Sequence, residues 1–177
     1  DIGYEIIEDV SIPEIMVFYN KDKNIYSIVH RGTQIQSQTG IMDIMSDLTL
    51  FMNKNSKRIE ERVKETTDII DYIKSNETPN QDAHINLIGH SLGSFSSSLS
   101  FLDPYNLKNI NSLTTFSGAF FDSPILKEKL SKLSSDDINE LNRKSTHHRM
   151  EGDIVSLGSL KSLPFGELFS YQLTKGY

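Results

Sequence analysis

The 177-residue sequence contains no cysteine. The fold therefore has no disulfide, no thiol nucleophile and no thiolate metal site, and the redox compartment stays undetermined, so secreted and cytosolic locations both remain open. The sequence also lacks any apolar run of about 18 residues, the length that a membrane-spanning helix requires. Residues 1–3 provide neither an initiator methionine nor the apolar core of a signal peptide, and we expect a trimmed or processed N-terminus.

The sequence has fewer basic than acidic residues. The formal net charge is −6, from 18 Lys and Arg against 24 Asp and Glu. Nucleic acids and anionic membrane surfaces are bound through clustered basic faces, so we expect neither as a partner on electrostatic grounds. Hydrophobic residues make up 37% of the chain and charged residues 24%, which is ordinary for a folded protein of this length. We predict a single domain over residues 1–177.

A short glycine-rich motif stands between two predicted elements. Residues 89–93 have the sequence Gly-His-Ser-Leu-Gly; the apolar run 83–88 before them predicts a buried strand, and residues 94–102 can continue as a helix. In this context Gly-x-Ser-x-Gly is typical of a nucleophile elbow, a turn so sharp that only glycine avoids steric conflict on either side of the serine. We predict that Ser91 is a nucleophile; the alternative is an ordinary glycine-rich turn.

Two further segments extend the pattern, namely residues 29–33 (Val-His-Arg-Gly-Thr) and residues 152–156 (Gly-Asp-Ile-Val-Ser). Together with the elbow they resemble the class 3, or fungal-type, lipases of the α/β-hydrolases, and order and spacing match from about residue 26 to 157. The resemblance implies an α/β fold with a mostly parallel central sheet flanked by helices. It also implies hydrolysis of carboxylic esters, such as acylglycerols or other lipid esters, through an acyl-enzyme on Ser91, with transient contact to a lipid interface and no metal or organic cofactor.

The resemblance assigns three more site residues. The threonine or serine after Arg-Gly ends a central strand in that family and donates a backbone N–H to the oxyanion hole, a position that Thr33 takes here. Leu92, the residue after the nucleophile, supplies the second N–H. Asp153 follows a predicted strand and is the candidate acid that orients the catalytic histidine. The alternatives are a loop threonine at Thr33 and a glycine-aspartate turn at Asp153. Asp43 and Asp47 resemble acidic residues that the family places after its Arg-Gly-Thr segment, and we expect them to hold the oxyanion loop.

The catalytic base is not evident. The family order is serine, acid, histidine, yet no histidine follows Asp153. Three explanations remain open. A histidine follows Tyr177 in a longer protein, which we favour; or the chain is a catalytically inactive lipase-like module that binds a lipid or a protein; or His147 or His148 acts in an unusual geometry. The same elbow is also compatible with a thioesterase or a peptidase.

The remaining pattern predicts the order of the elements. A strand, a long helix and the elbow strand in succession indicate the crossover of a parallel sheet. The serine-rich stretch after Ser91 has small side chains that allow a helix to lie close to the sheet. Phe120 and Phe121 are interpreted as core aromatics, with an acyl pocket as the alternative. We expect hairpin strands at 15–19 and 25–30, helices at 41–52, 56–75, 125–133 and 136–142, and further strands at 112–116 and 146–150.

Overall fold

The computed structural model describes residues 3–32, 56–76, 82–118, 124–150 and 165–172. These residues form a seven-stranded sheet whose spatial order is the order of the sequence, from β1 to β7. The strands are β1 (Glu5–Ile6), β2 (Ile15–Asn20), β3 (Ile25–His30), β4 (His84–His90), β5 (Ser112–Phe116), β6 (Ser145–Met150) and β7 (Glu167–Tyr171). The helices are the short η1 (Glu8–Val10), α2 (Ser56–Ser75), α3 (Leu92–Phe101), α4 (Pro104–Asn109), α5 (Pro124–Ser131) and α6 (Ser135–Lys144).

The sheet changes from antiparallel to parallel pairing at β3. The β-branched and aromatic runs of β2 and β3 form the predicted hairpin, in register from Ile15 opposite His30 to Asn20 opposite Ile25. From β3 onward each strand pairs in parallel with the next one along the chain. The predicted α/β fold with a mostly parallel sheet is therefore confirmed.

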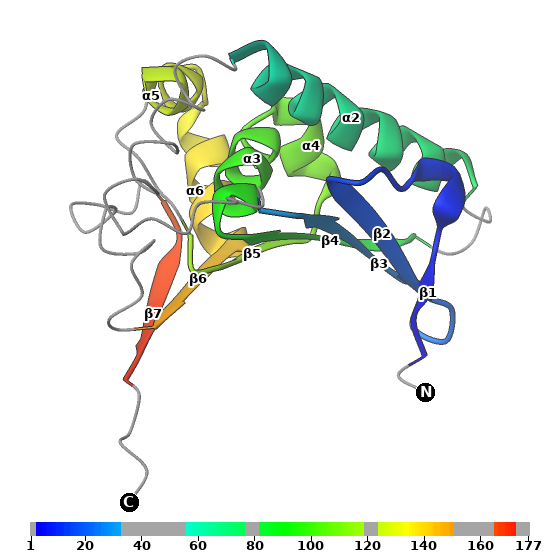
Figure 1. The fold of residues 1–177 in the computed structure, drawn as a ribbon. Coiled ribbons are helices and arrows are strands. Elements are labelled where there is room, and N and C mark those ends of the chain that lie inside the picture. The colour runs from blue at the N-terminus through cyan, green and yellow to red at the C-terminus, as the bar shows by residue number, and fades with distance from the viewer. Residues whose placement is uncertain (1–2, 33–55, 77–81, 119–123, 151–164, 173–177) are drawn as a thin grey trace, which may run out of the picture.

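The described helices lie over one face of the sheet, as Figure 1 shows. Parallel connections are almost always right-handed, and each connection here moves one strand in the same direction, so successive helices arrive on the same side. The serine-rich helix α3 packs on β3, β4 and β5, and α2 and α4 pack against α3. The nucleophile turn is thus held between the sheet and a layer of helices.

The core lies between this helix layer and the sheet. On β4, Ile85 and Leu87 are buried, whereas the alternating residues Asn86 and Ile88 point to the other face and are only half-buried. Ile70 and Ile73 on α2 are also fully buried and belong to the same cluster. Burying one such side chain stabilises the fold by roughly 1.5–3 kcal/mol, so this face supplies the rigid platform for the turn.

Most predicted elements are confirmed, with small shifts at their ends. Helix α2 has the predicted bounds, β4 extends through His90, and α3 begins directly after Ser91. Helix α4 was not predicted, although Asp103 caps it and Pro104 occupies its first turn. The expected helix at 41–52 and the pair Phe120 and Phe121 lie outside the described residues. Within the described part of the chain, no helix has the length and apolar character to cross a bilayer.

Candidate active site

The turn between β4 and α3 holds Ser91 in a strained backbone conformation. Its φ is 54° and its ψ is −123°, a region that residues other than glycine rarely adopt and that costs about 1–3 kcal/mol. Two backbone hydrogen bonds hold the turn: the Ser91 N–H donates to the Phe116 carbonyl at 3.0 Å, and the Ser94 N–H donates to the Ser91 carbonyl at 3.0 Å. Ser91 is half-buried, at the tip of a central strand. The strand–turn–helix context predicted for it is present.

The two glycines of the motif are needed for close packing. A Cβ on Gly89 would collide with the Ser97 hydroxyl and would lie 2.6 Å from the Ser94 Cα. A Cβ on Gly93 would collide with the backbone carbonyl of His30. Neither glycine has a left-handed φ. Their role is therefore to let α3 pass directly over the ends of β3 and β4, which is the steric reason predicted from the sequence.

The donors expected for the oxyanion hole lie on two sides of this turn. Leu92 is the first residue of α3, where backbone N–H groups have no partner within the helix and the helix dipole favours negative charge. On the other side, a Cβ on Gly32 would lie 3.1 Å from the Ser91 Cβ and 3.6 Å from the Leu92 nitrogen. The structure thus brings Gly32, Ser91 and Leu92 together. Thr33, Asp153, Asp43 and Asp47 lie outside the described residues.

Two of the five histidines are buried and have partners at both ring nitrogens. His30 Nδ1 lies 2.9 Å from Ser96 Oγ, and its Nε2 lies 3.0 Å from Thr66 Oγ1. Burial, with the nearby charge of Arg62, lowers the pKa of His30 to about 3. His147 Nδ1 lies 2.7 Å from Thr115 Oγ1 and its Nε2 lies 3.0 Å from the Phe165 carbonyl. Burial also lowers the pKa of His147, to about 4.

His148 lies in an aromatic row on the sheet face opposite the helices. Its ring stacks between Phe116 and Phe169, with centroids 5.1 Å and 5.5 Å away, and its Nδ1 lies 2.8 Å from the Tyr171 hydroxyl. In the sheet register Phe116 stands between His148 and His90. Within the described residues no hydrogen bond joins a histidine ring to Ser91 Oγ. These contacts give no support to the open explanation that His147 or His148 acts as the base.

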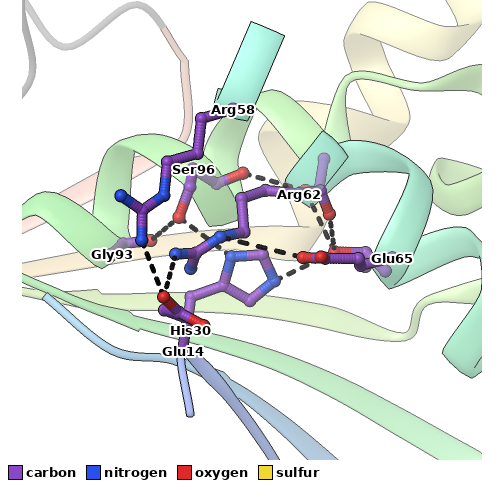
Figure 2. Close-up of polar contacts among 9 residues, drawn as sticks. Glu14, His30, Arg58, Arg62, Glu65, Gly93 and Ser96 are labelled. Carbon is purple, nitrogen blue, oxygen red and sulfur yellow. Dashed lines mark hydrogen bonds and ion pairs between the residues drawn. The ribbon is translucent and has the colours of Figure 1, made fainter. Parts of the chain in front are cut away.

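A group of charged residues surrounds the end of β3 on the helix side (Figure 2). Arg62 on α2 lies beside the His30 ring and pairs with Glu14 at 3.4 Å and Glu65 at 3.7 Å. Arg58 also pairs with Glu14, at 2.8 Å. Burial is the main cause that lowers the pKa of Arg62, and the two carboxylates oppose it. Since the Glu14 carbonyl also accepts the Arg31 N–H at 2.9 Å, this group links α2 to the strand end that carries Gly32.

The sequence did not indicate Thr66 and Ser96 as partners of His30. They lie 36 and 66 residues from it, and no local motif joins them. The one available signal was the polarity of their positions, a threonine on the apolar face of a long helix and a serine in the helix after the elbow. The described residues contain no group of three acidic, histidine or cysteine side chains that could hold a metal ion.

Comparison with solved structures places this geometry in a known fold. The Lip2 lipase from Yarrowia lipolytica superposes with a TM-score of 0.54 at 19% identity, over 94% of this chain and 65% of that protein. The fold is that of a fungal-type lipase. The sequence-based resemblance is thereby confirmed for the fold, and the Ser91 turn lies at the carboxyl end of a central strand, where α/β sheets bind their ligands.

A second lipase gives a weaker superposition. The triacylglycerol lipase from Penicillium expansum has a TM-score of 0.39 and 13% identity, over 89% of this chain and 61% of that protein. The chain thus spans less than two thirds of the length of either lipase. No family model matches the sequence, and no curated protein matches it.

Proposed function

We propose that this protein is a serine hydrolase that cleaves carboxylic esters, with lipid esters such as acylglycerols as the substrate class. The observation that carries the proposal is the backbone of Ser91, strained at φ 54° between a parallel strand and a helix that begins at the next residue. Strain of this kind persists only where the surrounding structure imposes it, and it is concentrated at functional sites. The lipase fold supports the same conclusion.

The proposed reaction has two stages. Ser91 Oγ attacks the ester carbonyl carbon, its proton passes to a histidine base, and the carbonyl oxygen becomes an oxyanion. The N–H groups of Thr33 and Leu92 stabilise this oxyanion; removing one such donor costs about 10²–10³-fold in rate. The C–O bond to the alcohol then breaks, and the histidine returns the proton to the leaving alkoxide. Water repeats the sequence on the acyl-enzyme and releases the acid.

Asp153 is proposed to orient the histidine and to stabilise its charged form. The identity of that histidine separates this proposal from its rival. The rings of His30, His147 and His148 are all engaged with other side chains or backbone groups, which favours, as a second candidate, an inactive lipase-like module that binds a lipid or a protein. Both candidates share the fold, so the serine itself must be tested.

The test is hydrolysis of short- and long-chain nitrophenyl esters by the full-length protein, with any residues that follow Tyr177, and by its Ser91→Ala variant. Ser131→Ala is the matched control, since this exposed serine lies at the end of α5 and, among the described residues, its hydroxyl donates only to the Glu128 carbonyl, at 2.8 Å. We expect hydrolysis by the protein and by Ser131→Ala, and only background hydrolysis by Ser91→Ala. A fluorophosphonate probe, read by peptide mass, should label Ser91. Equal background rates in all three proteins and no labelling would overturn the proposal and favour the binding module.

A further inference from the structure

The ring of His30 connects three elements at the end of β3. His30 is fully buried and is the last residue of β3. Its Nδ1 lies 2.9 Å from Ser96 Oγ on α3, and its Nε2 lies 3.0 Å from Thr66 Oγ1 on α2. Figure 2 shows the ring between these helices and beside Arg62. A strand, the helix of the nucleophile turn and the long crossover helix are therefore joined through one imidazole.

The partners of the ring extend this connection in both directions. Ser96 Oγ donates to the Gly93 carbonyl at 3.1 Å, inside the elbow motif. Thr66 Oγ1 lies 2.8 Å from the Arg62 carbonyl and 3.1 Å from Ser100 Oγ, so it links α2 back to α3. A neutral imidazole has one donor and one acceptor nitrogen, which suits two hydroxyl partners that can each give or receive a proton. A hydroxyl has one proton, so with an uncharged ring one of the two hydroxyls donates to the bare ring nitrogen instead of to its backbone carbonyl, and the other hydroxyl accepts from the ring N–H.

This network spans both sides of the proposed oxyanion pocket. Gly32 lies two residues after His30 and approaches the Ser91 Cβ and the Leu92 nitrogen. Ser96 belongs to the first turns of α3, which begins at Leu92. The distance between these two sides decides whether two N–H donors converge on one oxygen. A displacement of about 1 Å at such a site can cost about 10²-fold in rate.

We propose that His30 is a positioning residue, which fixes the strand end at Gly32 against the start of α3 at Leu92. The inference rests on the proposed esterase activity and adds a role for a residue that does not touch the substrate. It differs from an ordinary buried histidine in one respect. Weakening the network changes the geometry of the turn and the turnover number, beyond any loss of overall stability.

Each variant changes one polar side chain of the network, and the Thr66 change also removes the contacts of its hydroxyl to the Arg62 carbonyl and to Ser100 Oγ. Thr66→Val keeps the shape of the side chain but removes the partner of Nε2, and Ser96→Ala removes the partner of Nδ1. Ile73→Val is the matched control, because Ile73 is fully buried on α2 and belongs to the apolar core. His30→Gln keeps a donor and an acceptor in a neutral side chain, whereas His30→Leu keeps neither.

Two measurements are made on each variant. The first is kcat and KM for a short nitrophenyl ester, with the unfolding temperature recorded. The second is amide hydrogen exchange at Ser91 and Ser94, whose N–H bonds hold the turn. We expect Thr66→Val and Ser96→Ala to lower kcat about tenfold with KM within twofold, and to speed exchange at both amides. Ile73→Val should change neither kcat nor this exchange, and His30→Gln should retain more kcat than His30→Leu.

The outcomes separate the inference from the proposed function. Equal kcat and equal exchange at Ser91 and Ser94 in the network variants and in Ile73→Val would overturn the inference while leaving the esterase intact. If the unmodified protein hydrolyses no ester, the proposed function fails, and the exchange rates decide the positioning role by themselves. Faster exchange limited to the network variants supports it; exchange unchanged from the control contradicts it.

Discussion

At the scale of the residue, the nucleophile turn depends on the absence of a side chain at Gly93. A Cβ at that position would meet the backbone of His30 and would lie 2.8 Å from the carbonyl carbon of Arg31. Backbone atoms cannot rotate away as the end of a flexible side chain can. Any side chain at Gly93 must therefore push α3 away from β3, which also separates Leu92 from Gly32.

Gly93→Ala is predicted to destabilise the protein by about 1–3 kcal/mol, the usual cost of forcing extra atoms into a packed site. Activity should fall further than stability, because the displacement occurs beside the oxyanion donors. Urea unfolding and ester hydrolysis measure the two effects. A Gly93→Ala protein with unchanged stability and rate would show that α3 does not approach β3 as closely as the structure places it.

Ser98→Ala provides the contrast in the same helix. Ser98 is fully buried on α3, and its hydroxyl has no hydrogen-bond partner in the described part of the chain. A buried hydroxyl without a partner costs free energy, and alanine has the higher helix propensity. Ser98→Ala is therefore predicted to leave stability unchanged or raise it by up to about 1 kcal/mol, measured by the same unfolding experiment. A loss of more than this would point to a partner for the hydroxyl.

Asp153 gives a prediction for catalysis. If Asp153 orients the histidine, Asp153→Asn keeps its size but removes the charge that stabilises the imidazolium. In a serine protease the corresponding change lowers kcat by about 10⁴-fold. We expect a loss of about 10³–10⁴-fold in kcat with little change in unfolding free energy. Ester hydrolysis by Asp153→Asn within tenfold of the unchanged protein would exclude Asp153 as the acid.

How much of the site could be predicted depends on distance along the chain. Ser91 and its glycines were predictable because the steric demands of the turn are met within five consecutive residues. The network around His30 was not, because its partners come from two other elements and each hydroxyl is unremarkable in its own segment. Local motifs report backbone geometry, whereas side-chain partners depend on tertiary packing.

At the scale of the element, helix α6 shows how a helix start is selected. Two adjacent serines, Ser134 and Ser135, stand at its start. In the structure Ser134 Oγ accepts the Asp137 N–H at 3.1 Å, while the Asp137 carboxylate accepts the Ser134 N–H at 3.2 Å. This reciprocal capping box satisfies two N–H groups at a helix end.

The two serines are a matched pair for a test. Ser134→Ala removes the cap and is predicted to destabilise the protein by about 1 kcal/mol, whereas Ser135→Ala, one residue inside the helix, should change stability by less than about 0.5 kcal/mol. Thermal or urea unfolding of both variants checks the prediction. Equal losses in the two variants would mean that the capping box contributes nothing to stability.

Elements with a strong amphipathic pattern were predicted from the sequence, and those without one were not. Helix α2 was predicted with its observed bounds because its buried isoleucines recur at helical spacing. Strand β7 was missed because its five residues are all exposed, which leaves no buried face for a period of two to reveal. Helix α4 was missed because its six residues are too few to show a helical repeat of apolar positions, although the capping residue Asp103 could have been recognised in the sequence.

At the scale of the whole molecule, the fold buries two histidines on different strands of the sheet. His30 lies at the end of β3 under the helices, and His147 lies on β6 between Thr115 and the Phe165 carbonyl. Burial is the largest cause of the lowered pKa of each, to about 3 and about 4, against 6.5 for an ordinary histidine. Between these lowered pKa values and pH 6.5, both rings therefore stay neutral in the folded protein, whereas they would be charged in the unfolded chain.

The sign of the pH dependence follows from this difference. Above pH 6.5 both states hold neutral rings and the stability is complete. Below pH 6.5 the unfolded chain binds protons that the folded protein does not, so the free energy of unfolding falls as the pH falls, until the folded pKa values of about 4 and about 3 are reached. Each histidine contributes at most about 1.4 kcal/mol per pH unit in this window.

Between pH 7 and pH 5.5 we therefore expect the two histidines to lower the free energy of unfolding by roughly 2 kcal/mol. Urea unfolding at pH 7, 6 and 5.5 measures this loss above the range in which most carboxylates titrate. His30→Gln should be less stable at pH 7 but should lose only about half as much on acidification, because one of the two proton-binding differences is gone. The test compares the slope of the unfolding free energy against pH in the two proteins, and not their absolute stabilities. Identical slopes in the two proteins would mean that His30 is not held neutral by its surroundings.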